Sequence, residues 1–227
     1  MQVFQDIADL RAHIARYRRD DQEVAFVPTM GNLHAGHIAL VKAAREECER
    51  VVVSIYVNPL QFGVGEDFEA YPRTLEEDRQ KLEAAGAHVL FTPSDREIYP
   101  QGREFSTTID APAALTDTLC GATRPGHFRG VTTVVAKLFN VVQPNVAVFG
   151  EKDFQQLRVI QRMTTDLNLP IRIFGVPTQR EADGLAMSSR NGYLSAEERS
   201  KAPMIYVQLQ QAADHVRAGE DWNAVEA

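Results

Sequence analysis

Residues 23–60 read EVAFVPTMGNLHAGHIALVKAAREECERVVVSIYVNPL, and this stretch decides the fold. The short apolar run at 23–27 ends at Pro28, and residues 38–48 place apolar side chains at helical spacing. The run VVVSIYV at 51–57 is continuously apolar, which is typical of a strand buried on both faces of a parallel sheet. A strand, a helix and a second buried strand in this order predict a parallel β-α-β unit.

The same alternation continues on both sides of this stretch. Further strands are expected at 88–92, 146–150 and 171–176, and helices at 6–19, 74–85, 131–142 and 154–167. Two capping boxes mark helix starts, one formed by Thr74 with Glu77 and one by Ser195 with Glu198, which opens a helix to about residue 218. Strands joined by helix-length segments predict an α/β fold with a doubly wound parallel sheet.

The composition is that of a globular protein, and it argues against membrane and nucleic-acid partners. Of the 227 residues, 44% are hydrophobic and 24% charged. No apolar run approaches the ~20 residues that cross a bilayer, and residues 1–19 lack the apolar centre of a signal peptide, so we expect a cytoplasmic protein without a membrane partner. A formal net charge of −7 argues against a nucleic-acid surface. Cys48 and Cys120 are expected to be reduced structural thiols.

Doubly wound sheets bind ligands beyond the carboxyl ends of their strands, so the loops there are expected to carry the chemistry. These loops follow residues 27, 57, 150 and 176, and they contain PTMGNLHAGH, NPLQFG, GEKDFQQ and PTQREADGLAMSSRNG. The sequence has neither a GxxxxGK[ST] phosphate loop nor a Rossmann GxGxxG. Nucleotide phosphates would therefore be held by His, Lys, Ser and Arg side chains.

The sequence HAGH places His34 and His37 where a strand turns into a helix. Amide groups of the first helical turn point outward there, the helix dipole favours anions, and Gly36 lets a ligand approach the backbone. Two imidazoles add donors aimed at the same place, which suits a phosphate or a phosphoryl transition state. Two other interpretations stay open: a metal site, which lacks a third ligand nearby, and histidines that only cap the helix or fill the core.

Two further loops give modest support to a site for nucleotide phosphates. In MSSRNG, Ser188, Ser189 and Arg190 supply two hydroxyls and a guanidinium for phosphate oxygens, although Ser, Asn and Gly also form ordinary solvated turns. In GEKD, Lys152 brings a positive charge and Asp153 can accept hydrogen bonds from a ribose, although such a run is also common on surfaces. The prediction of a nucleotide site rests on all these loops meeting at one end of the sheet.

HxGH after the first strand, with a late loop similar to MSxSR, resembles the nucleotidyltransferase superfamily that includes class I aminoacyl-tRNA synthetases and cytidylyltransferases. Six segments in order narrow the resemblance to the pantoate–β-alanine ligase family: VPTMGNLHAGH, VNPLQF, YPRT, RPGHFRGV, FGEKDFQQL and ADGLAMSSRNGYL. The resemblance implies a Rossmann-like fold and a two-step reaction. ATP and pantoate give pantoyl adenylate and pyrophosphate, and β-alanine then displaces AMP to give pantothenate.

The resemblance also implies roles for individual residues. His34, His37 and Lys152 would be catalytic, with His37 the conventional catalytic histidine, and all three would contact ATP. The other ATP contacts would be Met30, Gly31, Asn32, Leu33, Ala35, Gly36, Gly150, Glu151, Asp153, Gln179, Met187, Ser188, Ser189 and Arg190.

Two glutamines, Gln61 and Gln156, would bind pantoate, since each side-chain amide offers both a donor and an acceptor to a small hydroxy acid. Gln61 and Asn58 would lie near β-alanine. Mg²⁺ is expected with ATP, held mainly by phosphates and water, and Asp78 is its protein ligand by resemblance. An acid in a first helical turn is favoured in any case.

The resemblance divides the chain at residue 178. Residues 1–178 would form the domain that binds ATP and pantoate, and residues 179–227 the start of a smaller, incomplete carboxyl-terminal domain that closes over the site. A homodimer with small-molecule substrates and no nucleic-acid partner is implied. Two rivals stay open: another nucleotidyltransferase such as a cytidylyltransferase, and a nucleotide-binding module without catalysis.

Overall fold

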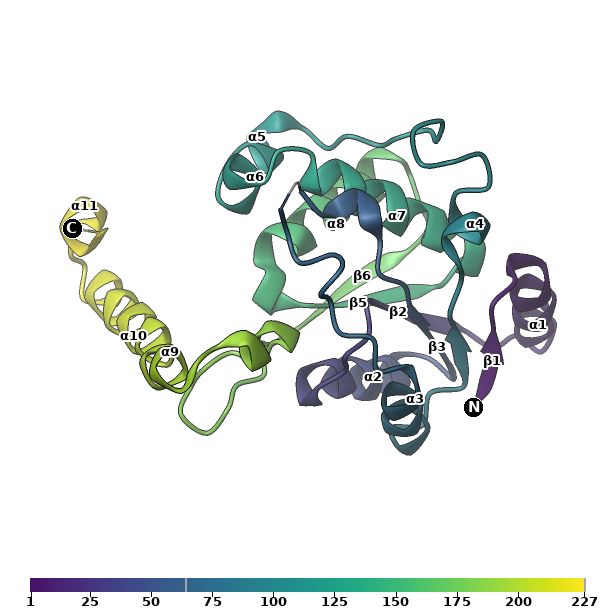
Figure 1. The fold of residues 1–227 in the computed structure, drawn as a ribbon, viewed down its shortest axis with the longest axis horizontal. Helices are drawn as coiled ribbons and strands as arrows, with labels where there is room; N and C mark the ends of the chain where they lie inside the picture. The colour runs from purple at the N-terminus through teal and green to yellow at the C-terminus, as the bar shows by residue number, and fades with distance from the viewer. Residues whose placement is uncertain (64, 227) are drawn as a thin grey trace.

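A six-stranded, all-parallel sheet forms the centre of the computed structural model, which describes residues 1–63 and 65–226 (Figure 1). The strands are β1 (Gln2–Phe4), β2 (Val24–Thr29), β3 (Arg50–Ile55), β4 (Val89–Phe91), β5 (Val146–Gly150) and β6 (Arg172–Val176). The predicted doubly wound α/β fold is confirmed. The short edge strand β1, which pairs with β4, was not expected from the sequence.

The sheet reverses its winding between β2 and β5. Its strand order is β1-β4-β3-β2-β5-β6, so from β2 the chain moves outward to β3 and β4, and from β5 it moves the other way to β6. Neighbouring strands whose connections leave in opposite directions open a crevice beyond their carboxyl ends. The loops after β2 and β5 are therefore the expected walls of a ligand site.

Two apolar layers hold helices against the sheet, because alternate strand residues point to opposite faces. Phe26 of β2 packs in the layer that contains α1, α7 and α8, and its neighbours Ala25 and Val27 pack in the layer that contains α2 and α3 (Figure 1). The helices up to β6 are α1 (Ile7–Arg19), α2 (Ala35–Glu47), α3 (Leu75–Ala84), α4 (Asp95–Ile98), α5 (Ala113–Thr116), α6 (Cys120–Thr123), α7 (His127–Val142) and α8 (Phe154–Asp166). The helix expected at 131–142 thus begins one turn earlier.

The two expected capping boxes have different outcomes. Ser195 and Glu198 form one: the Ser195 hydroxyl accepts from the Glu198 amide, and the Glu198 carboxylate accepts from the Ser195 amide at 2.8 Å. The box at Thr74 and Glu77 was a wrong prediction, since Thr74 makes no side-chain cap. Its hydroxyl instead donates to the buried carboxylate of Asp78 at 3.2 Å.

Beyond β6 the chain forms an arm that leads away from the sheet (Figure 1). The chain first forms η3 (Ser189–Tyr193), which is hydrogen-bonded to Asn32 and Asp67, and the arm then consists of α9 (Ala196–Lys201), α10 (Met204–Arg217) and α11 (Trp222–Glu226). The single helix expected from Ser195 to about residue 218 was a wrong prediction, because Pro203 has no amide hydrogen to continue α9 and starts a new helix instead.

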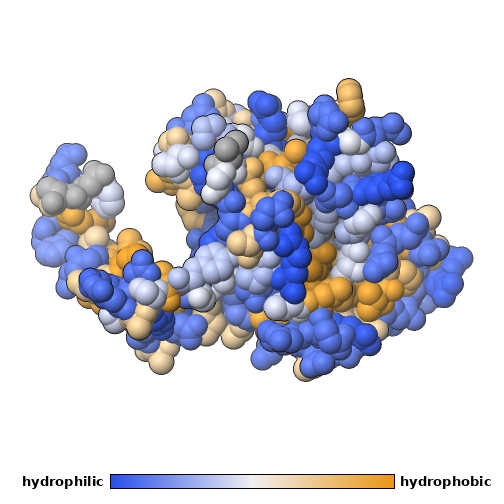
Figure 2. Space-filling model, viewed as in Figure 1, coloured by the Kyte–Doolittle hydropathy of each residue, from blue (hydrophilic) through white to orange (hydrophobic). Residues whose placement is uncertain are grey.

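Apolar side chains gather along this arm (Figure 2). Met204, Ile205 and Leu209 of α10 are 60%, 66% and 57% exposed. The division of the chain at residue 178 stays a prediction. Among the described residues, no helix combines the length and apolar character needed to cross a membrane.

Candidate functional site

The loops that follow β2, β3, β5 and β6 line one cavity at the carboxyl ends of the strands. The predicted site residues in its lining are Met30, His34, Gly36, His37, Asn58, Gln61, Gly150, Lys152, Asp153, Gln156, Gln179, Met187, Ser188, Ser189 and Arg190. The predicted residues outside its lining are Gly31, Asn32, Leu33, Ala35, Asp78 and Glu151. An apolar wall comes from α7, through Val131, Val134, Val135 and Leu138.

Both imidazoles of HAGH accept hydrogen bonds through Nδ1. His34, the N-cap of α2, accepts from the Gly36 amide at 3.1 Å, and His37 accepts from the His34 amide at 3.3 Å. A ring nitrogen that accepts carries no proton, so each neutral ring has its hydrogen on Nε2. The histidines therefore do cap the helix, and the same bonds leave two Nε2–H donors at the cavity. A Cβ at Gly36 would lie 2.8 Å from the His34 ring, which explains the glycine.

Burial keeps both imidazoles neutral. It lowers the pKa of His37 to about 3, and the adjacent His34 and Lys152 act in the same direction. Burial also lowers the pKa of His34, again assisted by Lys152. Protonation of either ring would require Nδ1, which already accepts an amide hydrogen. The cavity is thus provided with two neutral donors rather than with an acid and a base.

Acid is expected to destabilise the protein through His37. Its folded pKa lies below the ordinary value of 6.5, so the unfolded chain binds more protons between these limits. Stability is therefore retained above pH 6.5 and declines as the pH falls toward about 3, by about 1.4 kcal/mol per pH unit for this group. Thermal unfolding followed across this range should show the decline, less steeply in His37→Gln. The same slope in both proteins would contradict a His37 whose pKa is lowered in the folded protein.

The loop after β5 supplies a cation. Gly150 ends the strand, and η2 (Glu151–Asp153) brings Lys152 to the cavity. Lys152 Nζ lies 3.3 Å from the Asp153 carboxylate, and its side chain is 36% exposed. An ion pair this exposed to solvent holds the ammonium weakly. The Lys152 ammonium is therefore available to an anionic ligand beside His34 and His37.

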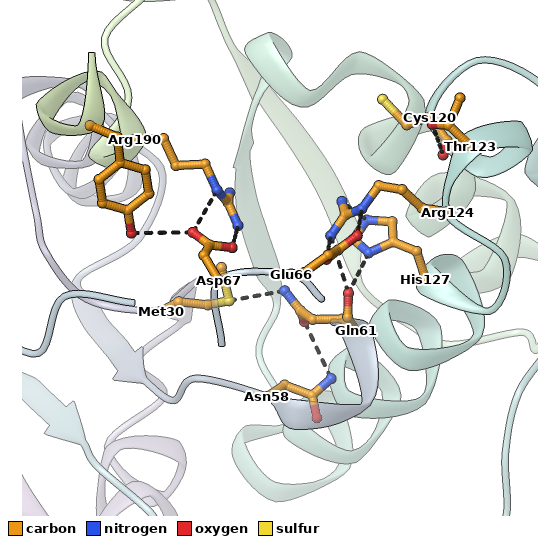
Figure 3. A network of polar contacts seen from close by, with 11 residues as sticks. Met30, Asn58, Gln61, Glu66, Asp67, Cys120, Thr123, Arg124, His127 and Arg190 are labelled. Atoms are coloured by element: carbon orange, nitrogen blue, oxygen red, sulfur yellow. Dashed lines mark hydrogen bonds and ion pairs between the residues drawn. The ribbon is translucent and has the colours of Figure 1, made fainter. Parts of the chain in front are cut away.

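The loop that contains MSSR (residues 187–190) is hydrogen-bonded to the loop that leads to HAGH (residues 34–37). Ser189 Oγ donates to the Asn32 carbonyl at 3.0 Å, and the Asn32 side-chain amide donates to the Ser189 carbonyl at 3.4 Å. Arg190 makes a two-pronged pair with Asp67 at 3.0 and 2.8 Å (Figure 3). Segments from the first and the second half of the chain therefore meet at the cavity.

Two amide side chains after β3 are held in fixed orientations. Asn58 is buried; its Oδ1 accepts from the Tyr99 hydroxyl at 2.8 Å, and its Nδ2 donates to the Gly130 carbonyl at 3.1 Å and to Gln61 Oε1 at 3.3 Å. Gln61 Nε2 lies 2.9 Å from Met30 Sδ (Figure 3). These contacts decide which end of each amide can meet a substrate.

Comparison with known proteins gives the family. The family model of pantoate–β-alanine ligases matches residues 2–227. The chain belongs to the pantoate–β-alanine ligase family. A pantothenate synthetase of Pseudomonas aeruginosa is 57% identical over 226 residues, which are 99% of this chain and 80% of that protein.

Solved structures of the ligase family agree. The pantothenate synthetase of Thermus thermophilus superposes with a TM-score of 0.93 at 51% identity, covering 99% of this chain and 79% of that chain. The pantoate–β-alanine ligase of Francisella tularensis, complexed with beta-gamma ATP and β-alanine, superposes with a TM-score of 0.87 at 40% identity, covering 92% of this chain and 79% of that one.

The polar residues of the cavity lining that sequence reasoning missed include Tyr71, Arg124 and His127. Arg124 Nε donates to Glu66 at 2.6 Å, and the His127 Nδ1 lies 2.7 Å from the Gln61 carbonyl (Figure 3). The signal was present, because these residues belong to the segments YPRT and RPGHFRGV that carried the family resemblance.

Asp78 does not fit the magnesium role that the ligase family resemblance implied. Its side chain is fully buried outside the cavity lining, and its two oxygens accept hydrogen bonds from the backbone amides of Asn32 and Leu33. Within residues 1–63 and 65–226, no group of three or more His, Cys, Asp and Glu side chains could hold a metal ion. A magnesium ion that accompanies ATP stays a prediction.

Proposed function

We propose that this chain activates pantoate with ATP as pantoyl adenylate and then transfers the pantoyl group to β-alanine. In the first step a pantoate carboxylate oxygen attacks the α-phosphorus of ATP, and the bond to pyrophosphate breaks. In the second step the amine of β-alanine attacks the acyl carbon, the nitrogen gives up one proton, and AMP leaves with the electrons of the C–O bond. The products are pantothenate, AMP and pyrophosphate.

The donors in the cavity suit the first step. A carboxylate is already ionised at neutral pH, so the attack requires no base, but it does require alignment and stabilisation of charge at the phosphorus. The Nε2–H groups of His34 and His37 and the ammonium of Lys152 are donors that need no proton transfer. Gly36 and Met187, also in the cavity lining, would complete the ATP side of the site.

A second set of residues in the cavity lining suits pantoate. The side chains of Gln61 and Gln156 lie in the same lining as the apolar face of α7. Amides match the hydroxyl and carboxylate groups of pantoate, and valine and leucine side chains match its two methyl groups. Asn58, hydrogen-bonded to Gln61, would help to receive β-alanine.

One observation carries the proposal: phosphate donors and paired amides from four separate loops line a single cavity at the β2–β5 reversal. Product analysis tests it. AMP and pantothenate should form only when ATP, pantoate and β-alanine are all present, and CTP should not replace ATP. A preference for CTP would favour a cytidylyltransferase. ATP binding by calorimetry without AMP formation would favour a binding module.

The finer parts of this proposal concern magnesium, assembly and domain closure. Mg²⁺ would arrive on the ATP phosphates, and residues 179–227 would belong to a second domain that closes over the cavity. The chain would pair as a homodimer through its sheet-bearing part. Light scattering of the purified protein tests the pairing, and a monomer at all concentrations would contradict it.

A further inference from the structure

A buried carboxylate lies under the loop that leads to His34. Asp78, in the first turn of α3, has no exposed surface. Its Oδ1 accepts from the Leu33 amide at 2.7 Å, and its Oδ2 accepts from the Asn32 amide at 2.8 Å and from the Thr74 hydroxyl at 3.2 Å. Both oxygens are therefore satisfied within the protein.

The two amides belong to a backbone turn of the kind that binds anions. Gly31 and Asn32 have φ values of 83° and 49°, both in the left-handed region. Such turns direct successive amide hydrogens toward one point and often hold phosphates. Here a side chain of the same chain fills the concavity. Asn32 is of a residue type that adopts the left-handed region more readily than most residues other than glycine.

A second residue of α3 contacts the same loop. Lys81 Nζ donates to the Leu33 carbonyl at 2.8 Å, so Asp78 and Lys81 hold both polar groups of the Leu33 backbone. His34 follows directly, and its amide donates to His37 Nδ1 at 3.3 Å. The directions of both imidazoles thus depend on where α3 holds this backbone.

We propose that Asp78 is a positioning residue for adenylation, which fixes the backbone at 31–33 and thereby aims the Nε2–H groups of His34 and His37. The inference rests on the proposed function and assigns Asp78 a role other than that of a magnesium ligand. The amides of Asn32 and Leu33 are consequently not donors to the ATP phosphates.

The kinetics of Asp78→Asn distinguish a residue that positions the loop from a magnesium ligand. Asparagine keeps the shape but presents one acceptor oxygen to two amides; Glu77→Gln, an exposed acid beside it, is the matched control. In pantoate-dependent exchange of pyrophosphate into ATP, kcat of Asp78→Asn should fall about 100-fold. The half-saturating Mg²⁺ concentration should stay at the wild-type value, and Glu77→Gln should behave as wild type. An unchanged kcat, or a raised half-saturating Mg²⁺ concentration with rescue by excess Mg²⁺ or Mn²⁺, would overturn the proposal.

Amide hydrogen exchange tests the geometry without relying on activity. In the nucleotide-free protein the Asn32 and Leu33 amides should be protected, and they should lose protection in Asp78→Asn but not in Glu77→Gln. Unprotected wild-type amides would contradict the proposal. If the wild type showed no ATP–pyrophosphate exchange, the proposed function would fail, and this protection would still decide whether Asp78 fixes the backbone at 31–33.

Lys81→Met covers the case in which Asp78→Asn does not fold. It removes the other α3 contact with the Leu33 backbone and leaves every carboxylate in place. We expect kcat to fall in the same direction, by about 10-fold, with an unchanged Mg²⁺ dependence. Full activity in Lys81→Met would count against a loop held in place by α3.

Discussion

His37→Ala is expected to lower the rate of pantoate-dependent adenylation by about 10²–10³-fold, the usual cost of one preorganised donor to a developing charge. The His37 ring is neutral because burial lowers its pKa to about 3, and its Nδ1 is occupied by the His34 amide. Nε2–H is therefore the group that the substitution removes from the reaction. Stopped-flow or exchange kinetics at saturating ATP measure the loss.

Two further variants show whether the lost group is a donor. His37→Gln places an amide N–H near the former Nε2 position and should recover part of the rate. His215→Ala removes an exposed histidine that pairs with Glu220 on the arm, and it should leave the rate unchanged. Equal losses in His37→Ala and His37→Gln, with both proteins folded, would contradict a role as a neutral donor.

Lys152→Met should cause a loss of similar size, about 10²–10³-fold in kcat/KM for ATP. The residue is the cation of the loop after β5, beside the two neutral imidazoles. At about 4 Å, one unit charge interacts with another by about 4 kcal/mol near a protein surface, which is large enough for this effect. The rate of AMP formation as a function of ATP concentration gives the value.

Stability separates this kinetic effect from damage to the fold. The Lys152–Asp153 pair is largely exposed, and such pairs contribute about 0–1 kcal/mol, so the thermal midpoint of Lys152→Met should stay close to wild type. Lys152→Arg should retain more activity than Lys152→Met, and Lys201→Met, a matched loss of an exposed lysine in α9, should retain all of it. A Lys152→Met variant with wild-type kcat/KM would refute the assignment.

The sheet could be predicted because its strands are continuous apolar runs. Val51–Val53 and Val24–Val27 are fully buried. Continuous apolar runs of this kind are typical of strands inside a parallel sheet that helices cover on both faces. The position of HAGH after the first long strand then placed His34 and His37 at the reversal point. The backbone amides that donate to the two imidazoles could not be predicted, because the contacts of each Nδ1 depend on the geometry of the first helical turn.

The errors arise where a side chain has two possible partners. Thr74 has the sequence of a capping residue, but the buried Asp78 carboxylate takes its hydroxyl. Asp78 itself has the sequence of an exposed acid near a helix start, and only the folded chain brings the Asn32 and Leu33 amides to it. Sequence spacing describes neighbours along one helix, whereas this contact joins residues more than forty positions apart.

Arg124 shows the limit of assigning a site motif by motif. It directly follows α6, one of the four-residue helices between β4 and α7, which are too short to show an apolar period. Its ion pair with Glu66 lowers the pKa of that carboxyl and joins two segments that the sequence analysis left without a role. The family segment RPGHFRGV pointed to this region, but the role of Arg124 within it became visible only with the cavity.

The most direct test of adenylation at this site is exchange of labelled pyrophosphate into ATP in the absence of β-alanine. Reversal of the first step requires ATP, pantoate and the intact donor set, but not the amine. We expect exchange that appears only when pantoate is added and that is lost in His37→Ala. Exchange that is independent of pantoate, or a folded, ATP-binding protein with no exchange in its presence, would contradict it.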